Sequence, residues 1–159
     1  NSVGLQQAES AARALAGRQI SKIVSSPARR VLQTVQPFVD AHAIPLQIDD
    51  DLMEFFVGGF EGQLIASIRK AHDLRHDSSW MSVLPDDADS WHEFVPRVCA
   101  AVWRWTERHP DEAILVASHG LVFRALTEAL IGEQLSSGNA ETHHFEPVGD
   151  AWSVSPVTI

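Results

Sequence analysis

The sequence has one cysteine, no cluster of basic residues and no apolar run that approaches the length of a membrane helix. Cys99 alone cannot form an internal disulfide, so we expect a reducing, cytoplasmic setting and a buried, unreactive thiol. A membrane helix requires roughly 18 consecutive apolar residues, so we expect no membrane span. Acidic residues outnumber basic ones by 21 to 12, which argues against nucleic acid or an anionic membrane as a partner. A small phosphorylated substrate stays compatible with this balance, because a phosphate needs only a local group of donors.

No internal repeat, linker or low-complexity segment interrupts the chain. Its 159 residues, 45% of them hydrophobic and 21% charged, are typical of a soluble protein with one core. We therefore expect a single domain over residues 1–159. No basic and then apolar signal segment opens the chain, and its first residue is Asn1 rather than methionine.

Hydrophobic periodicity, capping residues and glycine or proline positions predict an alternation of helices and strands. The expected helices are residues 1–17, 27–43, 90–110 and 121–132, with one more helix and a loop within 63–87. The expected strands are residues 20–26, 45–48, 113–118, 142–147 and 151–159, with a structured loop at 49–62. We expect the strand at 113–118 to be fully buried, because it is continuously apolar. Strands that alternate with helices predict an α/β fold, a three-layer sandwich with a mostly parallel central sheet and helices on both faces.

Two strand ends carry candidate site residues, because ligands of open α/β sheets bind at the carboxyl ends of the strands. The stretch "SSPARR" closes the strand at 20–26 and opens a helix, which places Arg29 and Arg30 in the first helical turn. Cations there oppose the helix dipole unless an anion lies nearby. This pattern suggests a phosphate clamp, and two solvated arginines on a helix surface are the alternative.

The second strand end is "VASHG", where His119 and Gly120 follow an apolar strand. A histidine beside a glycine that permits close backbone approach suits an oxyanion or a proton transfer. A hydrogen-bonded structural histidine is the alternative. Glu54, set among apolar residues in "LMEFFVGGFEG", is a candidate general acid, because an apolar setting raises the pKa of a carboxyl group. The alternative is one more surface acid.

The remaining histidines suggest no metal site. His72 and His76 are four residues apart, as two ligands on one helix face would be, but no third ligand is evident. His143 and His144 are neighbours on an expected strand and therefore point to opposite faces. We expect neither a metal nor a cofactor.

Four ordered sequence blocks resemble the histidine phosphatase superfamily, the phosphoglycerate mutase-like proteins. "GLQQA" is similar to the family's Gly-x-x-Gln-Ala helix start, and "VASHG" is similar to its Ser-His-Gly strand end. "SSPARRVLQT" resembles Ser-Pro-x-x-Arg-Ala-x-x-Thr, with valine in place of the alanine. "LMEFFVGGFEG" resembles Leu-x-Glu-x-x-x-Gly-x-x-Glu-Gly. The matching residues are Gly4, Gln7, Ala8, Ser26, Pro27, Arg30, Gln33, Thr34, Leu52, Glu54, Gly58, Glu61, Gly62, Ser118, His119 and Gly120.

The resemblance implies roles for these positions. Arg30, rather than Arg29, would bind the phosphoryl group with His119, while Ser26 and Gly120 would complete the phosphate pocket. Glu54 would donate a proton to the leaving group. Asp89 and Ser90 fall where the family has a Glu-Ser pair, a departure that bears on substrate contacts.

The family's nucleophile is a histidine in an Arg-His-Gly motif on the first strand, and no such motif occurs in these 159 residues. We expect that strand and motif upstream of Asn1. The resemblance implies a metal-independent phosphomonoester hydrolase, similar to acid phosphatases, that acts through a phosphohistidine. The alternatives are a phosphoglycerate mutase-type phosphotransferase and a pseudoenzyme that binds a phosphorylated ligand without a nucleophile. The substrate and the oligomeric state do not follow from the sequence.

Overall fold

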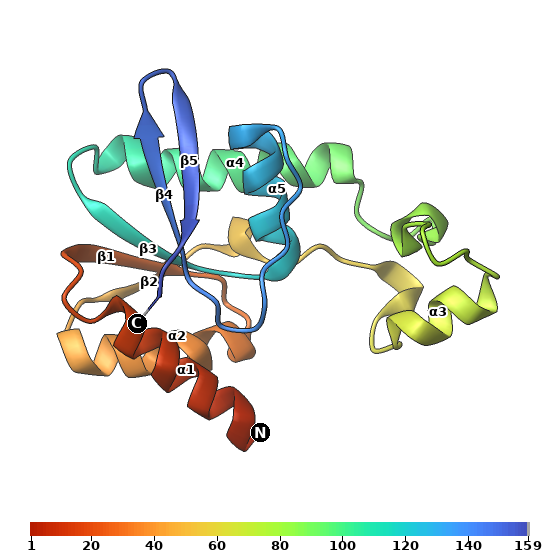
Figure 1. The fold of residues 1–159 in the computed structure, drawn as a ribbon, viewed down its shortest axis with the longest axis horizontal. Coiled ribbons are helices and arrows are strands. Elements are labelled where there is room, and N and C mark those ends of the chain that lie inside the picture. The colour runs from red at the N-terminus through yellow and green to blue at the C-terminus, as the bar shows by residue number, and fades with distance from the viewer. Residues whose placement is uncertain (159) are drawn as a thin grey trace. The chain divides into compact units, whose positions relative to one another are not determined.

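The computed structural model describes residues 1–158 and divides the chain into two compact units. The first comprises Asn1–Glu54 and the chain from Val95 onward, and the second is Phe55–Phe94. Figure 1 shows the elements along the chain. The α-helices are α1 (Ser2–Leu15), α2 (Arg29–His42), α3 (Ile65–Ala71), α4 (Trp91–Arg108) and α5 (Gly120–Ile131). The strands are β1 (Ile20–Ser25), β2 (Leu46–Ile48), β3 (Ala113–Ala117), β4 (His143–Val148) and β5 (Ala151–Pro156).

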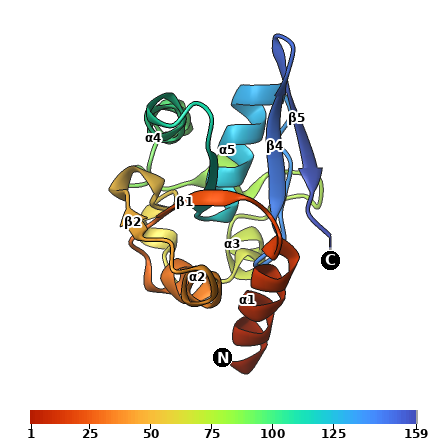
Figure 2. The ribbon, with the colours of Figure 1, turned by 90° about the vertical axis from the view of Figure 1, so that its left-hand side faces the viewer.

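The first unit has a parallel sheet with helices on both faces, which confirms the predicted fold class. Strand β1 lies between β2 and β3 and pairs in parallel with both, while β4 and β5 form an antiparallel hairpin. Helices α1 and α2 lie on one side of this sheet, and α4 and α5 lie on the other (Figure 2). The hairpin matches the two strands expected after residue 141, and Ile159, the last residue of that expectation, lies outside the described residues.

Alternating side chains of β1 bind these layers together, because successive residues of a strand point to opposite faces. Ile23 packs with Leu15 and Phe38 of α1 and α2. Val24, the next residue, packs with Leu52 and with Ala101 of α4. All of these side chains are buried. The sheet therefore has a core on each face, and both cores hold β1 in place.

The structure corrects the expected burial of β3. Ala113 is exposed and the other four residues of the strand are partly buried. Within the described part of the chain, β3 pairs only with β1, so its second edge has no strand against it. The continuously apolar sequence had predicted a fully buried strand.

One proline precedes α2 and another lies inside it. Pro27 was expected as the first residue of a helix, but α2 begins at Arg29 with Ala28 as its N-cap. Pro37 lies inside α2, and the helix continues through it to His42. The helix still carries both arginines in its first turn, as predicted.

The second unit is built mainly from short elements. It contains α3 and two 3-10 turns at Gly58–Phe60 and Trp80–Val83. Phe55 and Phe94, both buried, meet edge to face with ring centroids 5.2 Å apart, and Trp91 stacks on Phe94. None of the described helices in either unit combines the length and the hydropathy that a transmembrane span needs.

Candidate active site

The carboxyl ends of β1 and β3 lie side by side and lead into two helix N-termini. Ser25 of β1 is in register with Ala117 of β3, and the Ser26 backbone N–H donates to the Ala117 carbonyl at 3.0 Å. The chain then enters α2 at Arg29 and α5 at Gly120. Parallel pairing thus brings the predicted "SSPARR" and "SHG" stretches together, although 93 residues separate Ser26 from His119.

His119 joins these two stretches through both of its ring nitrogens. Its Nδ1 lies 3.0 Å from Nη2 of Arg30, and its Nε2 lies 2.8 Å from Oγ of Ser26. A guanidinium has no acceptor, so Arg30 donates and Nδ1 accepts. The proton of the neutral ring is therefore on Nε2, which donates to Ser26.

Burial and charge both keep this imidazole neutral. His119 is 9% exposed and caps the N-terminus of α5 without a side-chain hydrogen bond to it. Burial, and secondarily the Arg30 guanidinium, lowers the pKa of His119 from its ordinary value of 6.5 to about 4. Because its Nδ1 accepts, the ring offers that atom as a donor only after it gains a proton.

The structure distinguishes the two adjacent arginines. Arg30 reaches His119, whereas Arg29, in the described part of the chain, has no hydrogen bond or ion pair from its guanidinium. Both lie in the first turn of α2, where no acidic residue offsets their charge. The assignment of phosphoryl binding to Arg30 rather than Arg29, which the resemblance implies, remains a prediction.

Gly120 and Ser26 complete the strand-end cluster. Gly120 is exposed, and a Cβ added there would meet no atom within 4 Å. Packing within the protein therefore does not explain a glycine at this position, whereas a group bound close to the backbone would. Ser26 is fully buried, and its hydroxyl accepts from the Ala28 N–H at 3.3 Å.

The loop that carries Glu54 is attached to the same strand ends. The Ser118 hydroxyl donates to the Leu52 carbonyl at 2.8 Å, and the Ser26 hydroxyl lies 3.4 Å from Sδ of Met53. Glu54 follows directly and is half-buried. Of its predicted apolar neighbours, Leu52 and Phe55 are buried and Met53 and Phe56 are exposed.

Two arginines of α4 hold this loop, and sequence reasoning missed both. Arg97 donates to the backbone carbonyls of Asp51 and Met53. Arg104 donates to the carboxylates of Asp49 and Asp51 at distances of 2.8 to 3.1 Å. The acidic run at residues 49–51 is a sequence signal for the partners of Arg104, whereas the backbone carbonyls that Arg97 binds leave none.

Trp105 also binds Asp49, because its Nε1–H donates to Oδ2 at 2.7 Å. Burial acts to raise the pKa of the Asp49 carboxyl, but the hydrogen bonds from Arg104, Trp105 and the Asp51 backbone together lower it below its usual value. Asp49 is therefore an ionised anchor for the start of the loop.

Asp89, one of the two residues that depart from the family's Glu-Ser pair, forms a reciprocal pair within the second unit. Its carboxylate accepts from the Phe56 N–H at 2.9 Å, and its own N–H donates to the Phe56 carbonyl at 2.8 Å. Nearby, Asp87 accepts from the Gly59 N–H, and a Cβ on Gly58 would lie 2.3 Å from the Asp87 carboxylate. These contacts give both aspartates hydrogen bonds within this unit, and the close approach of Asp87 leaves no space for a side chain at position 58.

The structure also separates the two histidines considered as metal ligands. Helix α3 ends at Ala71, so His72 is its C-cap and His76 lies in the turn beyond. The two histidines therefore do not share a helix face. Across the described residues, no three histidine, cysteine or acidic side chains are grouped as a metal site.

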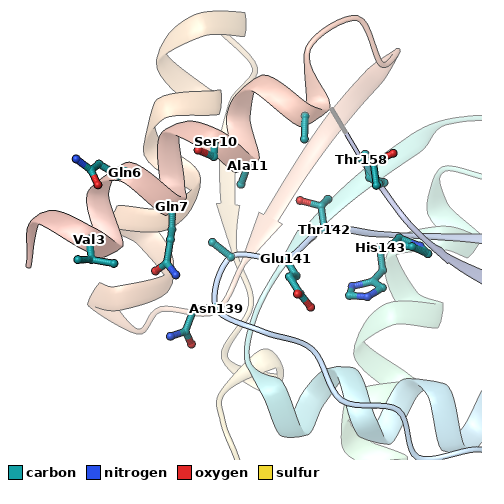
Figure 3. Close-up of a pocket in the computed structure, with 14 residues that line it drawn as sticks. Val3, Gln6, Gln7, Ser10, Ala11, Asn139, Glu141, Thr142, His143 and Thr158 are labelled. Atoms are coloured by element: carbon teal, nitrogen blue, oxygen red, sulfur yellow. The ribbon is translucent and has the colours of Figure 1, made fainter.

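A groove of about 630 Å³ lies between α1 and the segments around β4 and β5 (Figure 3). Its walls carry amide and hydroxyl groups, among them Gln6, Gln7, Asn139 and Thr142. Gln7 belongs to the "GLQQA" block. The groove residues do not include Arg30, Ser26 or His119, so the strand-end cluster, and not this hollow, is the candidate active site.

Comparison with known proteins gives a consistent result. Glucosyl-3-phosphoglycerate phosphatase of Mycolicibacterium vanbaalenii is 31% identical over 82% of the chain and 62% of its own length. Phosphoglycerate mutase-like protein 4 of Arabidopsis thaliana is 32% identical over 80% of the chain and 58% of its own length. The chain thus spans about three fifths of these relatives.

Among solved structures, a mycobacterial glucosyl-3-phosphoglycerate phosphatase in complex with VO3 has a TM-score of 0.83. The two chains are 22% identical, and the match covers 98% of this chain and 84% of the other, which supports the fold. The family model of the histidine phosphatase superfamily (branch 1) matches residues 1–156. The protein therefore belongs to the histidine phosphatase superfamily.

Proposed function

We propose that this chain forms most of the catalytic domain of a phosphomonoester hydrolase that acts through a phosphohistidine intermediate. Residues 1–159 would work as one domain, with the nucleophilic histidine on an Arg-His-Gly segment upstream of Asn1. The observation that carries this proposal is the 3.0 Å contact between Arg30 and His119 at the joined ends of β1 and β3.

The reaction would proceed in two displacements. The upstream histidine attacks phosphorus, the bond to the leaving oxygen breaks, and Glu54 gives its proton to that oxygen. Glu54, now a carboxylate, then takes a proton from water, whose oxygen attacks the phosphohistidine and releases inorganic phosphate and the histidine.

Arg30 and His119 would stabilise the charge on the transferred oxygens, which is where most of the catalysis of phosphoryl transfer lies. The free N–H groups in the first turn of α5 would also face the transferred oxygens. No acidic residue lies in that turn to repel an anion. A guanidinium, an imidazole and a helix N-terminus can do the work of a metal ion here, so we propose a metal-independent reaction.

The substrate class we propose is a small phosphorylated molecule. The mycobacterial relative is named for a phosphorylated glycerate, and the acidic surface of this chain disfavours nucleic acid. The lone, half-buried Cys99, whose thiol pKa is raised by burial, fits the proposed cytoplasmic location.

The test uses protein that includes the upstream segment, and a panel of phosphomonoesters. We expect phosphate release that survives EDTA and is blocked by vanadate, and quenching with denaturant at alkaline pH should trap phosphate on a histidine, because phosphohistidine is labile in acid. Transfer of phosphate to a glycerate in preference to water would favour the mutase alternative. Phosphoester binding without turnover, or no Arg-His-Gly upstream, would favour the pseudoenzyme.

A further inference from the structure

The loop that carries Glu54 is held by α4 through two different kinds of contact. Arg104 binds carboxylate side chains at the start of the loop. Arg97, two helical turns earlier in α4, binds the backbone carbonyls of Asp51 and Met53, which lie 44 to 46 residues away in the sequence. Arg97 is half-buried, next to the buried Val98 on the same helix.

The contacts of Arg97 fix the peptide group that precedes Glu54. Nη1 donates to the Asp51 carbonyl at 2.8 Å and to the Met53 carbonyl at 3.4 Å, and Nη2 donates to the Met53 carbonyl at 3.4 Å. The Met53 carbonyl belongs to the peptide bond that links Met53 to Glu54. A planar fork of donors on two carbonyls restricts both the position and the tilt of that peptide.

We propose that Arg97 is a positioning residue that aims the Glu54 side chain at the leaving group. This inference rests on the proposed function, because it assigns to Arg97 an effect on the proton transfer by Glu54. General acid catalysis needs the acid within hydrogen-bond reach of the proton acceptor. A misplacement of about 1 Å can cost on the order of 100-fold in rate.

The segment that Arg97 binds is also attached to the ends of β1 and β3. The Leu52 carbonyl is bound by Ser118 and the Met53 sulfur by Ser26, so the other tethers come from the strand ends. Without Arg97, the loop would keep its attachment to the sheet but lose the constraint on the peptide before Glu54. A specific loss of proton transfer should follow, rather than loss of phosphate binding.

The experiment compares two substrates in the active protein. Glycerol phosphate has a poor leaving group that needs a proton, whereas p-nitrophenyl phosphate has a leaving group that needs little help. The ratio of their kcat/KM values does not depend on how much of a preparation is folded, so partial misfolding cannot mimic the effect. The variants are Arg97→Met, Arg97→Lys, Glu54→Gln and the double variant Arg97→Met with Glu54→Gln.

Arg97→Met should lower the glycerol phosphate to p-nitrophenyl phosphate ratio by about 10- to 100-fold. Arg97→Lys should fall between Arg97→Met and the unmodified protein, because an ammonium cannot present the planar fork. In the Glu54→Gln background, Arg97→Met should cause no further change in the ratio, since the group it positions is already gone. Arg108→Met, at an exposed arginine of the same helix, should leave the ratio unchanged.

Equal losses on both substrates, or losses that add in the double variant, would overturn the positioning role. Full retention of the ratio by Arg97→Lys would also overturn it, because charge alone would then suffice. If the unmodified protein hydrolyses neither substrate, the proposed function fails first. The two failures are therefore distinguishable.

Discussion

Binding of an anion beside His119 should be accompanied by uptake of a proton. In the structure, Nδ1 of His119 accepts from Arg30, and the pKa of the ring is about 4. An anion that takes over the Arg30 donor would leave Nδ1 beside negative charge, which favours the protonated ring. Protonated Nδ1 could then donate to the anion.

The direction of the pH effect follows from this order of pKa values. A ring whose pKa is higher with the anion bound than without it makes binding tighter as the pH falls through the higher value. The gain is complete below the lower value, about 4. If the ring in the complex regains a pKa of 6.5, the difference from the free value of about 4 corresponds to about 3.4 kcal/mol of binding free energy, or about 300-fold in affinity. Screening at the exposed side of Arg30 reduces this, so we expect about 10- to 100-fold between about pH 7.5 and about pH 4.5.

Sulfate is the appropriate probe, because it stays a dianion over this range while phosphate does not. Calorimetry in two buffers with different ionisation enthalpies gives the number of protons taken up directly. We expect close to one proton per sulfate near a pH of about 5.5, between the free and bound pKa values of the ring. His119→Asn keeps a polar side chain that does not titrate, and Glu54→Gln tests whether the Glu54 carboxyl group is responsible instead.

His119→Asn should remove the proton uptake, and Glu54→Gln should leave it. A sulfate affinity that does not change with pH, or proton uptake that survives in His119→Asn, would refute the reasoning. Loss of uptake in Glu54→Gln alone would assign the titration to the carboxyl group.

Substitutions at four positions test the site. Arg30→Ala should lower kcat by about 10²- to 10³-fold, whereas Arg29→Ala should change it less than about threefold. Equal losses would contradict the proposal that Arg30, and not Arg29, faces the phosphate. Glu54→Gln should cost about 10²- to 10⁴-fold on an alkyl phosphate and much less on p-nitrophenyl phosphate, and equal losses would exclude Glu54 as the acid. Gly120→Ala should leave the melting temperature unchanged or raise it, since alanine favours helix, yet raise KM by about tenfold if a substrate occupies that space; an unchanged KM would argue against a contact there.

The parallel sheet explains why part of the site was predictable. Strand ends can be recognised from local sequence, and parallel strands place their carboxyl ends at one edge, so the sequence alone is enough to group Arg30, Ser26 and His119. The choice of Arg30 over Arg29 came from the family resemblance, and the fold supplies its geometry. The ends of helices were less predictable, because Pro27 and Ala28 remain outside α2 and His76 lies beyond α3.

The arginines of α4 could not be found in the same way. Their partners are 44 to 55 residues away, and those of Arg97 are carbonyl groups, which every residue has. Backbone acceptors leave no mark in a sequence. Only the packing of α4 against the β1 side that carries Val24 brings the two arginines to the loop.

The Ser26 hydroxyl links His119 to the loop that carries Glu54. It accepts from His119 Nε2 and from the Ala28 N–H, so its own proton is available to Met53 Sδ, 3.4 Å away. Protonation of His119 occurs at Nδ1 and leaves the Nε2 donor in place, so the contact with Ser26 persists in both protonation states. The loop before Glu54 is therefore attached to the side of the ring that does not titrate. On this proposal, Arg30 and a bound anion exchange as partners of Nδ1 while Ser26 and Arg97 hold the loop before Glu54 in place.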